Sequence, residues 1–251
     1  MVLLVLTTLA LSACGEDQGT PAAAGTPSPS EAAAGPFLPA PPTSPGAAAD
    51  TGPAAQALSA AARKTSESGS FRVKLSASFA GAANGPRGSM DGTGESESHT
   101  RFHLALAFNS GTQQLTTESV SYDGVNYGRS NTQPWRVVSG AGSSGDPRSY
   151  LGYLSGATAV RDTGAGVQGG QPAERFEAIV PIQRKTPATA PGAPVAPATP
   201  GQMVAWVDAA SGRLVAEELT TSAGTPRETH LNIVFSDFGA AIKVAPPLTT
   251  P

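Results

Sequence analysis

The sequence FRVKLSASF at residues 71–79 alternates strictly between apolar and polar side chains. A period of two residues is that of a β-strand with one face buried and the other in water. The sequence RFHLALAF at residues 101–108 repeats this period. We therefore expect two amphipathic antiparallel strands that turn their apolar faces toward a common core. Those faces would carry Phe71, Val73, Leu75, Ala77 and Phe79 from the first strand, and Phe102, Leu104, Leu106 and Phe108 from the second.

Shorter stretches of the same kind fill much of the remaining chain. Asp123-Gly124 is a strong hairpin turn signal between two of them. The glycine-rich residues 162–172 are expected to separate two strands, with a flexible loop at residues 164–169, and the proline-rich residues 184–200 are expected to lack regular structure. Further strands are expected at residues 89–98 (weak, because glycines interrupt it), 115–122, 125–127, 135–138, 158–161, 174–182, 203–208, 213–221 and 229–235, with a short edge strand within residues 236–247.

Two stretches have the period of a helix. Residues 54–68 are rich in alanine and lie between a proline and a glycine, which suit a helix start and stop. Residues 146–157 begin with Asp-Pro and place Tyr150, Leu151 and Leu154 on one face. The order helix, meander, helix, meander predicts an α+β fold, and a large antiparallel sheet tends to curl. A sheet that curls over two such short helices would leave its concave face incompletely filled, and a ligand could lie there.

The N-terminal residues 1–13 form an apolar run too short to cross a bilayer, which takes about 20 residues, so we interpret them as an export signal. The run ends in Leu11-Ser12-Ala13-Cys14, which resembles the bacterial lipobox, in which the cysteine receives a diacylglyceryl group. The alternative is an ordinary signal peptide or short anchor with an incidental cysteine. No basic residue precedes the run, so either the true start lies upstream or the signal is atypical. Residues 14–53 would then be a lipidated N-terminus and a disordered Ala/Pro-rich linker.

The composition limits the remaining alternatives. After the linker, about 200 residues are left, enough for one domain with a substantial core. A net charge of -3 without a basic cluster argues against a nucleic-acid partner. Because the chain has a single cysteine, no intramolecular disulfide can form, and burial alone must stabilise the exported domain.

Glycine motifs suggest a nucleotide site at first sight. The sequence GAGSSG at residues 140–145 matches the dinucleotide-binding pattern G-x-G-x-x-G. We reject this interpretation because Asp146-Pro147 starts the helix only after the third glycine, and no further βα unit follows. A second match at residues 164–169 has no helix after it. We expect no cofactor.

The titratable residues give no catalytic or metal-binding pattern. His99 and His103 would lie roughly 13 Å apart along a strand, too far to share a metal ion. These two and His230 fall on polar strand faces, so we expect surface histidines and no metal site. G-x-S-x-G, S-x-x-K and H-E-x-x-H do not occur. We expect a protein that is not an enzyme.

The second half of the chain resembles the LppX/LprG-type actinobacterial lipoproteins of the LolA/LolB-like superfamily. The resemblance is carried by YLGYLSGA at residues 150–157, ERFEAIV at 174–180, VAWVDAASGRL at 204–214, and FSDFG at 235–239 followed by VAPP at 244–247. It implies a half-barrel: a curved antiparallel sheet with short helices on its concave face, which in the better-known members holds acyl chains. Relatives usually carry a helix where this chain has residues 184–200, and proline forbids a regular helix there. The cavity is therefore expected to be open at that point or absent.

The sequence thus predicts a membrane-anchored extracytoplasmic lipoprotein, lipidated at Cys14, with one LolA-like domain at residues 54–247. It would bind or carry a lipid, glycolipid or other apolar ligand between sheet and helices. The alternative is a non-enzymatic envelope interaction or sensor domain that binds protein partners instead. The residues expected to line the cavity are Phe71, Val73, Leu75, Phe79, Phe102, Leu104, Leu106, Phe108, Tyr150, Leu154, Leu231, Ile233 and Phe235.

Overall fold

The computed structural model describes residues 50–79, 87–111, 113–138, 146–154, 156–182, 198–225 and 228–248. The signal segment, Cys14, the linker up to residue 49, the GAGSSG motif and residues 184–197 of the proline-rich insertion lie outside the described residues.

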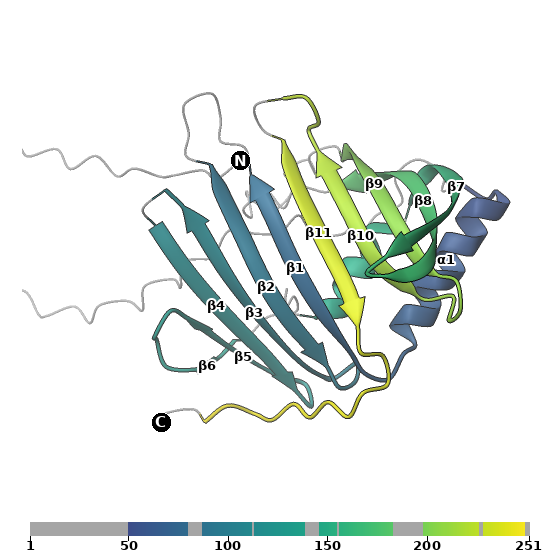
Figure 1. The fold of residues 1–251 in the computed structure, drawn as a ribbon. Helices are drawn as coiled ribbons and strands as arrows, with labels where there is room; N and C mark the ends of the chain where they lie inside the picture. Colours follow the sequence, from purple (N-terminus) through teal and green to yellow (C-terminus); the bar gives the residue numbers. More distant parts are fainter. Residues whose placement is uncertain are drawn as a thin grey trace, which may run out of the picture.

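One large antiparallel sheet dominates the described chain (Figure 1). Its strand order is β6-β5-β4-β3-β2-β1-β11-β10-β9-β8-β7, so two meanders meet where β1 pairs with β11. The elements are α1 (Pro53–Ser66), β1 (Phe71–Phe79), β2 (Gly88–Ser96), β3 (Arg101–Ser110), β4 (Gln113–Tyr122), β5 (Val125–Ser130), β6 (Arg136–Val137), the 3₁₀ helix η1 (Pro147–Leu154), β7 (Thr158–Gln168), β8 (Gln171–Ile182), β9 (Thr199–Asp208), β10 (Leu214–Thr221) and β11 (Thr229–Ser236).

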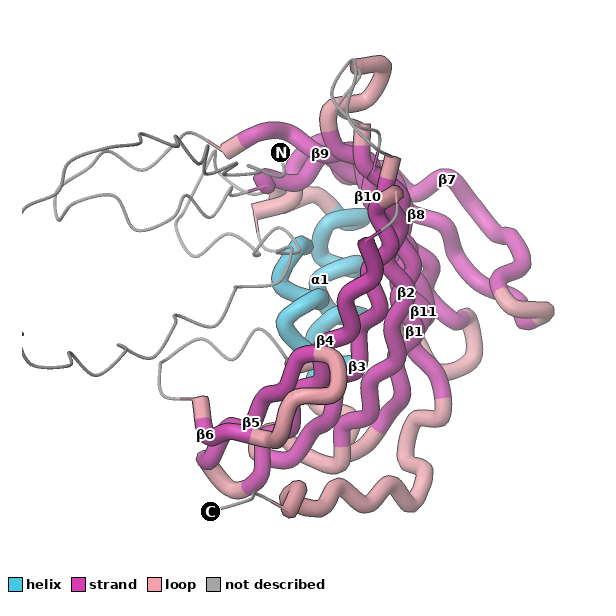
Figure 2. The backbone as a smooth tube through the Cα atoms, turned by 90° about the vertical axis from the view of Figure 1, so that its left-hand side faces the viewer, coloured by secondary structure: helices cyan, strands magenta, loops and turns pink. Residues whose placement is uncertain are grey.

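The sheet is curved and both helices lie on its concave side (Figure 2). Strand β1 shows why one face is apolar: its side chains alternate between buried and exposed from Phe71 to Ser78. The register continues this face into the neighbouring strand, because Leu75 lies opposite Ile233 and Val73 opposite Phe235. The predicted curved half-barrel with short helices on its concave face is confirmed. Within the described ranges, neither helix is long or apolar enough to span a bilayer.

The helices start where the sequence indicates. Pro53 opens α1, which buries Ala55, Leu58, Ala61 and Thr65, a face of mostly small side chains that can approach a sheet closely. The second helix is a 3₁₀ helix, and the backbone N–H of Arg148 donates to Asp146 Oδ1 at 2.8 Å, as expected for a residue that caps a helix start.

The prediction of a flexible loop at residues 164–169, within the glycine-rich residues 162–172, is wrong. Residues up to Gln168 continue β7, the chain turns at Gly169-Gly170 with φ of 59° and 82°, and β8 begins at Gln171. Only glycine adopts two successive positive φ values at little cost, so these two residues make the hairpin. Inside β7, Gly164 is exposed, whereas a Cβ atom at Gly166 would lie 2.8 Å from the Trp206 ring, so glycine lets this ring pack against the strand.

The C-terminal residues 237–248 contain no strand, in contrast to the predicted short edge strand. They run as an extended tail along the lower ends of the first meander (Figure 1). Ile242 and Val244 are buried there against Val120 on the convex face. The tail is fixed by polar contacts as well, since the Val244 N–H donates to Glu97 Oε2 at 2.8 Å and the Ser70 hydroxyl donates to the Ala240 carbonyl at 2.6 Å.

Candidate functional site

The candidate site is the apolar layer between the concave face of the sheet and the two helices, which we call the sheet–helix core. All thirteen side chains predicted to line a cavity are on this side of the sheet. Eleven of them are buried, while Phe79 and Leu106 are partly buried. The rings of Phe71 and Phe235 lie edge to face at 5.9 Å between centroids. The structure therefore brings these residues together on the predicted face; that they line a ligand cavity stays a prediction.

The helix η1 covers the centre of this core. It buries Tyr150, Leu151, Tyr153 and Leu154, so aromatic and aliphatic groups face the strands. The rings of Tyr150 and Tyr153 are 6.4 Å apart, and Tyr153 is fully buried. Burial raises the pKa of both phenols, and the charges of Tyr150 and Glu217 raise that of Tyr153 further.

Arg148 fixes η1 at its position over the sheet. Its side chain is only 7% exposed and its guanidinium lies over the Phe71 ring at 4.9 Å. Burial lowers the pKa of this group, and the charge of Asp146 acts in the opposite direction. The guanidinium donates to the carbonyls of Ser66 (3.3 Å), Ser68 (3.2 Å), Gly69 (2.9 Å) and Ser98 (2.8 Å) and to the hydroxyl of Ser96. It thus joins η1 to the end of α1 and to the β2–β3 turn.

The second meander contributes residues that the sequence analysis did not include. Strands β8 to β11 place further apolar side chains on the same face, and the period of two in residues 174–182 was a signal that could have found some of them. These residues are Phe176, Ala178, Val180, Ile182, Met203, Ala205, Val207, Leu214 and Leu219, and the first meander adds Met90.

One carboxyl group lies among these apolar side chains. Glu217 of β10 is 0% exposed, and neither of its carboxyl oxygens has a hydrogen-bond partner among the described residues. It faces the core because it lies opposite Ala205 of β9 and Ile233 of β11, both of which are buried on the concave side. Burial raises the pKa of this carboxyl well above its ordinary range. The sequence pattern of residues 213–221 predicted a strand but did not single out Glu217.

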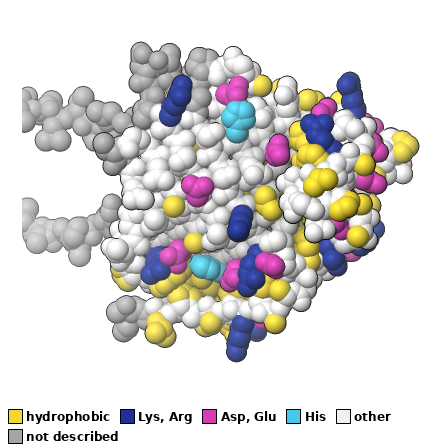
Figure 3. Space-filling model, in the orientation of Figure 1, with side chains coloured by type: hydrophobic (Ala, Val, Ile, Leu, Met, Phe, Trp, Pro, Cys, Tyr) yellow, Lys and Arg dark blue, Asp and Glu magenta, His cyan; other side chains and the backbone are white. Residues whose placement is uncertain are grey.

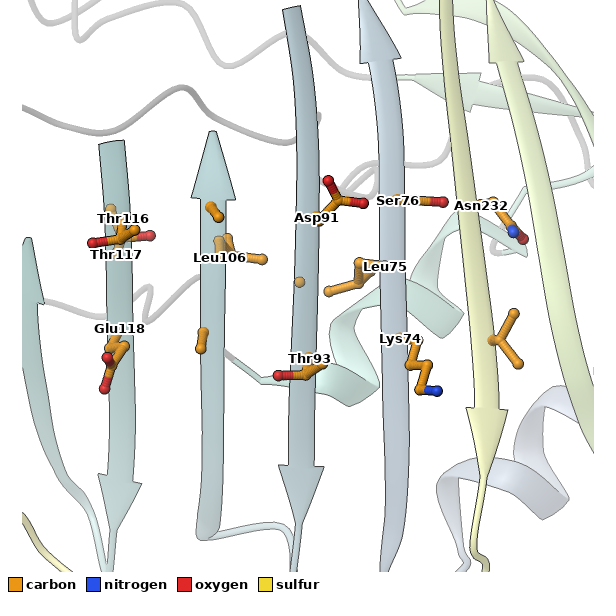
Figure 4. Close-up of a pocket in the computed structure, with 14 residues that line it drawn as sticks. Lys74, Leu75, Ser76, Asp91, Thr93, Leu106, Thr116, Thr117, Glu118 and Asn232 are labelled. Carbon is orange, nitrogen blue, oxygen red and sulfur yellow. The ribbon is translucent and has the colours of Figure 1, made fainter. Parts of the chain in front are cut away.

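The convex face is hollowed where its side chains are small. A shallow depression of about 600 Å³ extends over β1 to β4 and β11 (Figure 4). The outward-facing side chains Lys74, Asp91 and Glu118 lie around its small residues, among them Ser76 and Ala105. Much of this face is neither apolar nor charged (Figure 3). Several charged side chains on this face pair with one another, Arg129 with Glu118 at 2.8 Å and Arg72 with Glu95 at 2.9 Å.

The three histidines lie apart on the polar side of their strands or in a turn. His99 and His230 are exposed, and His103 is half-buried beside Glu118, with 3.7 Å between its Nε2 and Oε2 of the carboxylate. Among the described residues, no group of three or more His, Cys, Asp or Glu is placed to hold a metal ion.

These features define a class of proteins: open antiparallel half-barrels whose apolar concave face packs against short helices. A solved structure of this class is LprF from Mycobacterium bovis, with a TM-score of 0.52, 16% identity, and coverage of 77% of this chain and 96% of LprF. The likeness is one of fold, and it confirms the predicted LppX/LprG-like, LolA-like fold.

Two further solved structures share less of the geometry. The lipoprotein LppX from Mycobacterium tuberculosis gives a TM-score of 0.39 at 13% identity, covering 76% of this chain and 98% of LppX. A LolA superfamily protein from Nitrosomonas europaea gives 0.24 at 10% identity, covering 73% and 91%. No family model matches the sequence, and no curated protein is significantly similar to it.

Proposed function

We propose that this chain is a lipid-anchored extracytoplasmic protein that binds a lipid or other apolar ligand in the sheet–helix core, without a chemical step. The observation that carries the proposal is the unequal size of the two layers. The concave face extends over an eleven-stranded sheet, whereas its described helical cover consists of α1, with 14 residues, and η1, with 8. Such an open sheet can accept an acyl chain beside or beneath its helices.

Burial of hydrocarbon supplies the affinity in this mechanism. Each methylene group removed from water contributes about 0.8 kcal/mol, so a palmitoyl chain would gain about 12 kcal/mol before the cost of ordering it. The helix α1 is a suitable moving part because its buried face is mostly alanine and it contacts few elements besides the strands of the second meander and η1. Thr65 attaches it to β10, accepting from the Leu214 N–H at 2.8 Å.

The anchor is the second part of the proposal. Cys14 would carry two or three acyl chains, and more than one chain is needed for stable membrane attachment. Incorporation of labelled palmitate into the wild type, with none into Cys14→Ser, is the expected result in an actinobacterial host. Equal labelling of both chains would contradict lipidation at this cysteine.

The ligand is tested by native mass spectrometry of a secreted form in which a cleavable signal peptide replaces residues 1–14. We expect an additional non-protein mass that organic extraction removes. Leu106→Trp places a large ring on the concave face and should reduce the ligand-bound fraction. The matched variant Ala107→Trp places the same ring on the opposite face of β3 and should leave it unchanged.

Spectra identical before and after extraction would contradict the lipid-binding proposal. Copurification of a protein in place of a small apolar molecule would favour the envelope interaction domain.

A further inference from the structure

Glu217 is the one fully buried carboxyl group in the described residues, and its pKa is raised by burial with no contribution from a neighbouring cation. From η1 the phenol of Tyr153 interacts electrostatically with it, and its cross-strand neighbours Ala205 and Ile233 are apolar. Two arginines of neighbouring elements make other contacts: Arg148 donates to backbone carbonyls, and the guanidinium of Arg213 lies over the Phe238 ring at 5.3 Å.

A second polar group in the same layer is also without a partner. The hydroxyl of Tyr150, on a side chain only 3% exposed, finds no hydrogen-bond partner among the described residues. Its ring is next to that of Tyr153, whose phenol interacts electrostatically with both Tyr150 and Glu217. A carboxyl from the sheet and a hydroxyl from the helix are thus both unsatisfied at the interface that the proposed ligand would occupy.

Leaving such groups unpaired is costly, because a buried donor or acceptor without a partner loses its hydrogen bonds to water. Substituting leucine for this glutamate would avoid the loss, so a functional partner is the better explanation for a carboxyl at this position. Apolar surroundings favour the neutral form of a carboxyl, and this form both donates and accepts a hydrogen bond, as does the Tyr150 phenol.

We propose that Glu217 and Tyr150 form a polar anchor that binds a hydroxyl group carried on an aliphatic ligand chain. A hydroxyl matches the pair because it accepts a hydrogen bond from one group while donating to the other. An ammonium group would only donate, and would leave the phenol proton unmatched. This inference rests on the proposed lipid binding and names its ligand class: hydroxylated aliphatic chains in preference to plain ones.

The test compares stearic acid with hydroxystearic acids whose hydroxyl lies near the head, middle or tail of the chain. Each competes with a fluorescent fatty acid for the secreted protein. At least one hydroxylated chain should bind the wild type roughly tenfold more tightly than stearic acid, equivalent to about 1.4 kcal/mol.

Glu217→Leu and Tyr150→Phe should each abolish this preference while retaining affinity for stearic acid. The matched control is Glu218→Leu, which makes the same change at the neighbouring, exposed position of β10 and should keep the preference. Tyr150→Phe removes a single oxygen atom, so it serves as the test if Glu217→Leu does not fold.

The outcomes distinguish the proposed polar anchor from the proposed lipid binding. Equal affinity of the wild type for all four chains, or a preference that survives in Glu217→Leu and Tyr150→Phe, overturns the anchor and leaves lipid binding intact. Binding of none of the chains to the wild type overturns lipid binding, and the anchor with it.

Discussion

The buried carboxyl of Glu217 should make folding stability depend on pH. Burial raises the pKa of this group in the folded chain, whereas the unfolded chain has the ordinary value of about 4.3. Below that pH, Glu217 is protonated in both the folded and the unfolded chain, and its contribution to folding stability is fully present. As the pH rises, the unfolded state loses its proton first, so the free energy of unfolding falls by up to about 1.4 kcal/mol per pH unit until the folded pKa is reached.

The prediction is measured by urea unfolding of the wild type and Glu217→Gln from about pH 4 to about pH 7. The stability of the variant relative to the wild type should increase with pH. Asp146 also has a pKa raised by burial, but it is present in both proteins and its effect cancels in the difference. Tyr150 and Tyr153 do not titrate in this range, because burial raises the pKa of both phenols. Parallel stability curves would show that Glu217 has an ordinary pKa in the folded chain.

For single residues, the sequence indicated which face of the sheet most side chains lie on. Strict alternation placed Phe71, Val73 and Leu75 on the buried face correctly, because the period of a strand fixes the face. It could not do so in β10, where a bulge between Leu214 and Ala216 shifts the register. The bulge turns both Leu214 and Glu217, three residues apart, toward the core, and no local signal in the sequence marks it.

Among the elements, β2 shows why a strand can have a weak pattern. Its sequence GSMDGTGES places glycine where its neighbours have large side chains. A Cβ atom at Gly92 would lie 2.5 Å from Leu106 Cδ2, and one at Gly94 2.7 Å from Val73 Cγ1. The leucine and valine of the adjacent strands fill these positions. The apolar surface over β2 is thus supplied by side chains of β1 and β3. The sequence of β2 alone does not show this surface.

The C-terminal tail is the element whose contribution is most easily measured. Ile242 and Val244 are 8% and 6% exposed, so Ile242→Ala with Val244→Ala should remove about 3 to 5 kcal/mol of stability. Lys243 lies between them and is exposed, and Lys243→Ala should change stability by less than about 0.5 kcal/mol. Chemical denaturation of both variants gives the comparison. A double variant as stable as the wild type would mean that the tail is not bound to the convex face in solution.

For the molecule as a whole, the sequence indicated the two meanders but not how they join. Hairpins form between neighbouring segments, so turn signals such as Asp123-Gly124 reveal their order. The pairing of β1 with β11 joins segments about 150 residues apart, and nothing local in either strand specifies its partner. The contact of Arg148 with the end of α1 likewise joins residues that are 80 positions apart in the sequence.

This junction should be the most stable part of the molecule. Strands β1 and β11 each have a neighbour on both sides, and their inward side chains from Phe71 to Ala77 and from Leu231 to Phe235 are buried. At the two edges, β6 is exposed throughout and residues 161–165 of β7 are exposed as well. Backbone opening there uncovers little apolar surface, so its free energy should be close to zero, whereas opening at the junction should require nearly global unfolding.

Hydrogen–deuterium exchange resolved by peptide measures this difference. Peptides from β1 and β11 should exchange slowest, and those containing β6 and residues 161–165 within seconds to minutes. Strand β8 is an internal reference, because it pairs with β7 yet buries Phe176, Ala178 and Val180, and it should show intermediate rates. Equal protection of residues 161–165 and of β1 would mean that the β7 edge is covered in solution. The exposed strand would then be an interface, and the two ends of the half-barrel would have different roles.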